Sequence, residues 1–179
     1  MEINDTIFEE VRRYKSPGVI ERFCKIYGFE PADAELLFED VKSWLALACL
    51  AKKEHPEKNF VIDHALVAID EMWHNFVLFT HEYTQFCEKY FGGYLHHNPS
   101  TSENKGEEFE LMKKMSLEEK QKYAMDKLRW QYQYTMEKLG KETFLRWYQG
   151  YSRAYSEEVL AKLAYENTLK KGNAIQKAA

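Results

Sequence analysis

The segment from Asp63 to Tyr90 is the part of the sequence that most constrains the fold. Asp63 is a good N-cap residue and Gly92-Gly93 ends the segment, so the sequence predicts a helical segment between them. Its apolar residues cover most of the helix circumference: Leu66, Val67, Ile69, Met72, Trp73, Phe76, Val77, Leu78, Phe79 and Phe86. Because a helix that is apolar on most sides is buried by other helices, we expect this segment at the centre of a bundle.

Helix start and stop signals precede this segment. Ser16-Pro17 begins a predicted helix that Gly28 ends, since proline favours the first helical turn and glycine the left-handed end. Pro31 begins the next predicted helix, which His55-Pro56 closes. Both helices carry apolar residues at helical spacing, so both can pack on the central segment.

Similar signals follow the central segment. Ser116-Leu117-Glu118-Glu119 is a capping-box pattern, and it begins a predicted helix that runs to Gly140. A short aromatic helix before Gly150 and a last helix capped by Ser156 are expected next. Strand alternation is not found. The sequence therefore predicts an all-α fold, a single-domain irregular bundle of about six helices around the central buried segment.

One domain over residues 1–179 is the expected organisation, because this length suits a single core. Polar residues dominate from Asn98 to Met115, and we expect a mobile surface loop over residues 98–116 rather than a domain boundary. Residues 172–179 are expected to form a frayed tail.

Charge and composition exclude several classes of function. The formal charge is −4 and no dense Lys/Arg block occurs, so nucleic-acid binding is not expected. The longest apolar stretch, Trp44 to Ala51, is too short to cross a membrane, and the acidic N-terminus does not resemble a signal peptide. The three cysteines have no short metal-type spacing and are interpreted as reduced thiols. We therefore expect a cytoplasmic protein.

Histidines gather in and after the central segment, where five of the six lie between His64 and His97. Asp70 and His74 are four residues apart, so a carboxylate and an imidazole can reach one metal ion from one helix face. One more histidine would complete a two-histidine, one-carboxylate site of the kind that suits Fe(II) or Zn(II).

The source of the third ligand depends on the shape of the segment. His81 is the weaker candidate, because seven residues separate it from His74, about 10 Å along a helix. His96 and His97 follow Gly92 and reach back about 17 Å at most. On an unbroken helix His74 lies about 27 Å from Gly92, so these histidines reach it only if the segment breaks. The most plausible place for a break is near Thr80.

A structural explanation competes with the metal site. The polar residues of the segment would then form one solvated strip of an otherwise buried helix, in which Asp70 stabilises His74 as an i,i+4 pair. The members of this strip would be Asp70, Glu71, His74, Asn75, Glu82, Gln85, Glu88 and Lys89. Other catalytic templates are weaker: Cys87 has apolar neighbours, and neither a phosphate-binding glycine loop nor a nucleophile elbow occurs.

A spaced set of residues in and after the central segment is distinctive: Asp70 to Thr80, Tyr83 and Phe86-Cys87, and Phe91-Gly92 and Leu95 to Pro99. With these residues the chain resembles the glycine-rich domain-containing protein-like family. It corresponds to a short bacterial-type member without the glycine-rich tract. Plant members are similar to the pattern Asp-x-x-Trp-His-x-His, in which this chain has Phe76 at the second histidine. The resemblance implies that these residues recur: Asp70, Trp73, His74, Tyr83, Cys87, Gly92, His97 and Pro99.

Two functions follow as hypotheses. The first is metal binding or a metal-dependent activity on a small molecule or peptide, with Zn or Fe bound by Asp70, His74 and His96 or His97. The second is a non-enzymatic helical interaction module, whose aromatic surfaces or 98–116 loop contact a protein partner. The sequence does not predict the substrate, the metal or the oligomeric state.

Overall fold

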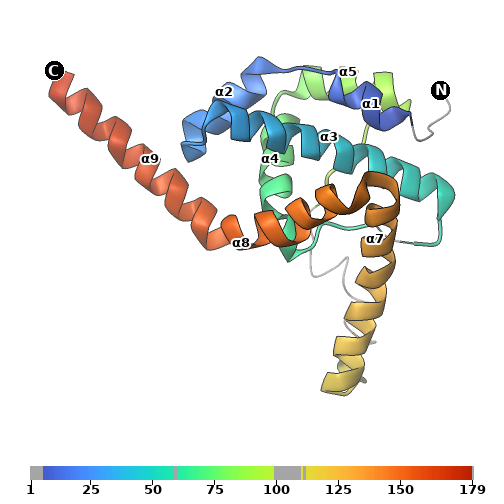
Figure 1. Ribbon diagram of the computed structural model, residues 1–179. Coiled ribbons are helices and arrows are strands. Elements are labelled where there is room, and N and C mark those ends of the chain that lie inside the picture. The colour runs from blue at the N-terminus through green and yellow to red at the C-terminus, as the bar shows by residue number, and fades with distance from the viewer. Residues whose placement is uncertain (1–5, 59, 99–109, 111, 179) are drawn as a thin grey trace.

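Helices α3 (Pro31–Glu54) and α4 (Val67–Val77) pack against each other at the centre of the fold (Figure 1). The computed structural model describes residues 6–58, 60–98, 110 and 112–178. Within these ranges the secondary structure is entirely helical, so the all-α prediction is confirmed. Both central helices contribute fully buried apolar side chains to one core, among them Leu45 and Phe76.

Two N-terminal helices cover one side of this pair. Helix α1 (Ile7–Arg12), which the sequence patterns did not indicate, packs on α3, and α2 (Pro17–Tyr27) contacts both central helices. The predicted limits of α2 are confirmed, and Gly28 ends it with φ +72°. Such a left-handed conformation favours glycine.

The central segment is interrupted near Thr80, where the sequence allowed a break but did not require one. After a 3-10 turn, η1 (His64–Leu66), helix α4 ends at Val77 and α5 (Thr80–Phe91) begins after Phe79. Phe79 has φ −84° and ψ 60°, outside the helical region. Its ring packs on the bare backbone of Gly18, where an added Cβ would lie 3.1 Å from Cε1. A tertiary contact with α2 therefore accompanies the break.

The C-terminal helices agree with the prediction at Gly140, where the helical conformation is interrupted, and differ from it at Gly150. Helix α7 (Leu117–Leu145) has the predicted capping box and a kink at Gly140, with φ 80° and ψ 167°. The predicted stop at Gly150 is wrong, because a π-helical segment η2 (Arg146–Tyr151) continues directly into α8 (Ser152–Ala154). Arg146 and Tyr151 of this π-helical segment donate hydrogen bonds to Asp40 of α3, which join the segment to α3.

The last helix, α9 (Glu157–Ala178), extends away from the core in Figure 1. The tail that we expect to fray, residues 172–179, begins within this helix, whose backbone is helical as far as Ala178. Its fraying stays a prediction. Most of the predicted 98–116 loop, residues 99–109 and 111, lies outside the described residues. None of the helices in the described ranges has the length and apolar character needed to span a membrane.

Candidate metal-binding site

Asp70 and His74 lie one turn apart on the same face of α4. Asp70 Oδ2 is 3.9 Å from His74 Nε2, and the two side chains are 28% and 48% exposed. Both are therefore accessible from outside the core, as the sequence predicted for one face of this helix.

Residues 92–98, which follow α5, fold back across α4 and are called the returning segment here. A chain of hydrogen bonds holds this segment in place. Trp73 Nε1 donates to the Tyr83 hydroxyl at 3.0 Å, and that hydroxyl donates to the carbonyl of Leu95 at 2.6 Å. Burial raises the pKa of Tyr83 far above its usual value, so the hydroxyl stays protonated and keeps donating. The break before Thr80 turns α5 so that these residues meet.

His97 lies at the end of this returning segment. Its Nε2 is 2.8 Å from Asp70 Oδ1, a hydrogen-bond distance. Its ring packs on Trp73 at a centroid distance of 3.9 Å and stacks on His74 at 4.5 Å. With 17% of its side chain exposed, His97 is the most buried of the three candidate ligands.

Three candidate ligands thus converge. One potential ligand atom from each of Asp70, His74 and His97 lies within 4.8 Å of the others, and no other such cluster occurs in the described ranges. The other two candidates lie outside it. His96 is exposed and its ring contacts Tyr94, whereas His81, exposed on α5, interacts with Gln85.

Glu71 is a member of this site that the sequence argument did not single out. Its Oε1 is 3.6 Å from His74 Nδ1, and its Oε2 accepts a hydrogen bond of 2.8 Å from the Tyr27 hydroxyl of α2. Burial and the Glu71 carboxylate raise the pKa of Tyr27 to about 12. Glu71 therefore lies near the imidazole nitrogen of His74 that faces away from Asp70. The sequence signal that could have identified Glu71 is its position three residues before His74, which makes the two side chains neighbours on the helix surface.

The solvated-strip explanation is correct for only part of the segment. Gln85, Glu88 and Lys89 are exposed. Asn75 is instead buried, where it accepts from Arg22 at 2.5 Å and donates to the Val19 carbonyl at 2.8 Å. Asp70, Glu71 and Glu82 likewise have polar partners, so the strip is not a uniform solvated face.

A cavity of about 500 Å³ lies beside the cluster. One wall contains Asp70, Trp73, His74 and His97, and His96 and Asn98 also line the cavity. The remaining lining residues, Trp44, Phe60, Val61 and Ile62, carry large apolar side chains. Gln131 of α7 fixes Val61 by hydrogen bonds to both its amide and its carbonyl, at 2.9 and 2.8 Å.

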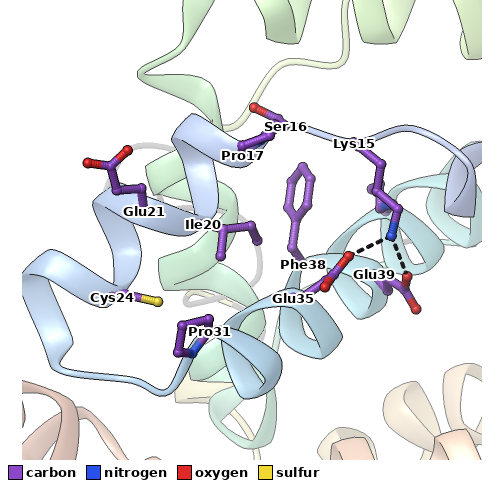
Figure 2. A pocket seen from close by; sticks show the side chains of 11 residues that line it. Lys15, Ser16, Pro17, Ile20, Glu21, Cys24, Pro31, Glu35, Phe38 and Glu39 are labelled. Carbon is purple, nitrogen blue, oxygen red and sulfur yellow. Dashed lines mark hydrogen bonds and ion pairs between the residues drawn. The ribbon is translucent and has the colours of Figure 1, made fainter.

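A second cavity, of about 470 Å³, lies between α2 and α3 (Figure 2). Ile20 and Phe38 extend into it, and at one end the Lys15 ammonium bridges Glu35 and Glu39 at 2.6 and 3.3 Å. The single ammonium offsets one of these two carboxylate charges. Because the described lining lacks a metal-ligand cluster, the cavity beside α4 is the better candidate for chemistry.

The cluster offers two imidazole nitrogens and one carboxylate oxygen. Ligand atoms around a tetrahedral zinc ion lie roughly 3.3 Å apart at bond lengths of about 2.0–2.1 Å. His97 Nε2 is 2.8 Å from Asp70 Oδ1, His74 Nε2 is 3.9 Å from Asp70 Oδ2, and the three ligand atoms lie within 4.8 Å of one another. Side-chain rotations would bring them to the spacing that an ion requires. Three protein ligands of this kind leave coordination positions open for water or a substrate.

The fold and the cluster define a class: an all-α protein with two histidines and one carboxylate beside an aromatic cavity. The chain belongs to the UCP032817-like family, whose match covers residues 9–117 and so includes Asp70, His74 and His97. This finding overturns the resemblance to the glycine-rich domain-containing protein-like family, which rested on short spaced motifs of the central segment. The family description names no activity, and no curated protein and no solved structure matches the chain.

Proposed function

We propose that this protein binds one divalent transition-metal ion, Zn(II) or Fe(II), through Asp70, His74 and His97. The ion would serve a metal-dependent activity on a small molecule or peptide that enters the adjacent cavity. The observation that carries the proposal is the convergence of three ligand atoms within 4.8 Å from two separate parts of the chain.

The surroundings of the ligands support the same proposal. Metal-bound histidines commonly direct their second ring nitrogen at a carboxylate, which orients the ring and makes it more basic. Glu71 occupies that position for His74, at 3.6 Å from Nδ1. Trp73 supports the ring of His97 from the core side. The ion would act as a Lewis acid or would lower the pKa of a bound water.

Metal content and affinity test this proposal. Protein stripped with chelator and reloaded with Zn(II) should contain one ion per chain by elemental analysis. His74→Ala and His97→Ala should each lose it, whereas the matched variant His81→Ala should bind like the wild type. The proposal would be contradicted if the wild type took up less than one Zn(II) ion per chain, or if all three variants bound Zn(II) equally well.

A second candidate function is a helical interaction module, which apolar side chains on α7 favour. Leu117, Met125 and Met136 are 72%, 61% and 44% exposed. An apolar hollow of about 440 Å³ lies along the same helix beside Met125 and Met136. In that case Met125→Glu with Met136→Glu should abolish recovery of a specific protein partner, and His74→Ala should leave its recovery unchanged.

A further inference from the structure

The charge of the cavity beside α4 restricts what can enter it. Among the described residues the lining contains no lysine or arginine, and Asp70 supplies its carboxylate. Phosphate and other polyanionic groups are usually bound by arginine, lysine or helix N-termini. A polyanionic substrate would therefore have few partners here beyond the ion and the histidines.

Aromatic rings make up much of the cavity lining. Trp44 packs between Phe60 and Trp73, at centroid distances of 5.6 and 5.2 Å. Trp44 and Trp73 are only 4% and 5% exposed, so their positions are fixed by the core. The hydrogen bonds from Gln131 hold the next residue, Val61, by both backbone groups. Binding against such rigid residues costs little side-chain entropy. A flat ring is favoured because aromatic rings stack on one another in offset or tilted arrangements.

An ion held by these three residues would keep positions open for a chelating group. A four-coordinate zinc ion has one open position and can expand to five-coordinate, which admits two oxygens, and an octahedral Fe(II) has three. His74 and His97 share the cavity with Trp44 and Phe60. A ligand that binds the ion through two oxygens would thus extend its remaining atoms along the rings. The volume of about 500 Å³ lies within the usual range for small-molecule sites.

We infer that the site takes a planar aromatic molecule bearing a bidentate oxygen chelating group, with the chelating oxygens on the ion and the ring against Trp44 and Phe60. This inference rests on the proposed metal site. Beyond the metal site, the inference adds that the ligand is aromatic and carries no phosphate group.

The test compares two probes with the same chelating group on the Zn(II)-loaded protein. Benzohydroxamic acid carries a ring, and acetohydroxamic acid carries a methyl group. Calorimetry should show benzohydroxamate binding at least about tenfold more tightly, which is the size of effect expected for burying a ring on an apolar wall. Phe60→Ala should reduce this preference while still binding Zn(II) with one ion per chain. Phe144→Ala removes a ring outside the cavity and should keep the preference.

The outcomes separate the two proposals. Equal affinity for the two hydroxamates on a zinc-loaded protein would overturn the aromatic-ligand inference and leave the metal site intact. The same inference fails if Phe60→Ala keeps the full preference. Protein that takes up no Zn(II) would overturn the metal site and the inference together.

Discussion

The hydroxyl of Tyr83 connects two parts of the candidate site that are far apart in the sequence. It accepts from Trp73 and donates to the Leu95 carbonyl. Tyr83→Phe should therefore loosen the returning segment and weaken Zn(II) binding by about 10–100-fold, as loss of outer-shell partners commonly does. Isothermal titration of the variant checks this, with exposed Tyr165→Phe as the control. Unchanged affinity would show that the hydroxyl does not position His97.

Lys42 should make stability depend on pH in a defined direction. Its side chain is fully buried, it donates to the carbonyls of Arg12 and Tyr14, and burial lowers its pKa from 10.5 to about 8. Below pH 8 the amine is charged in the folded and unfolded states, and the cost of burying that charge is fully present. Between the two pKa values the unfolded chain binds a proton that the folded chain has lost, so stability should rise with pH.

The difference in unfolding free energy between wild type and Lys42→Met isolates this effect. Urea titrations from pH 7 to 10 should show the difference growing in favour of the wild type as the pH rises. Burial raises the pKa of Cys49 from 9.0 to about 12, so buried thiols reduce stability above about pH 9, but they do so in both proteins. A difference that is independent of pH would contradict the prediction.

At the level of single residues, sequence reasoning found the two candidate ligands that share a helix face. Asp70 and His74 follow from helical periodicity alone. His97 could not be separated from His96, because the choice depends on which ring packs on Trp73. Glu71 entered only as a member of the competing solvated strip, since its partner Tyr27 is 44 residues away in the sequence.

Among the elements, η2 depends on a buried ion pair with α3. Arg146 donates to both carboxylate oxygens of Asp40, at 2.8 and 2.6 Å, and Tyr151 donates at 2.6 Å. Asp40 is only 3% exposed. Arg146→Met should destabilise the fold by about 3–5 kcal/mol, because it leaves a buried carboxylate without its cation.

A double substitution tests whether the unpaired charge is the cause. Asp40→Leu combined with Arg146→Met should recover much of the lost stability in urea denaturation, since neither charge remains buried. If the double variant loses as much as the two single variants together, the contacts are independent and this explanation is wrong.

Helix limits were predictable where a local residue determines them. Pro17, Pro31, Gly28 and Gly92 act through their own backbone geometry, and each marks a limit in the structure. The break before Thr80 could only be stated as a condition, because it accompanies the packing of Phe79 on Gly18. The π-helical turn was missed for the same reason, since its partner Asp40 lies more than 100 residues earlier.

For the whole molecule, α9 is peripheral to the candidate site. It packs on α2, where Asn167 donates to the carbonyls of Lys25 and Ile26 at 2.8 and 3.1 Å. A chain ending after Ser156 should lose roughly 2–5 kcal/mol of stability, from these bonds and the burial of Leu160. Its Zn(II) stoichiometry and affinity should match those of the full chain. Loss of metal binding in a truncated chain that remains folded, as judged by circular dichroism, would contradict this.

The returning segment has a thermodynamic consequence for metal exchange. Asp70 and His74 belong to a core helix, whereas residues 92–98 have no regular secondary structure and are joined to the core through Leu95. Such a segment opens at a lower free-energy cost than global unfolding. Opening would remove His97 from the cluster and leave the bundle intact. A metal ion would favour the closed form, so its affinity includes the closing equilibrium, and the protein could release the ion as a reversible local event.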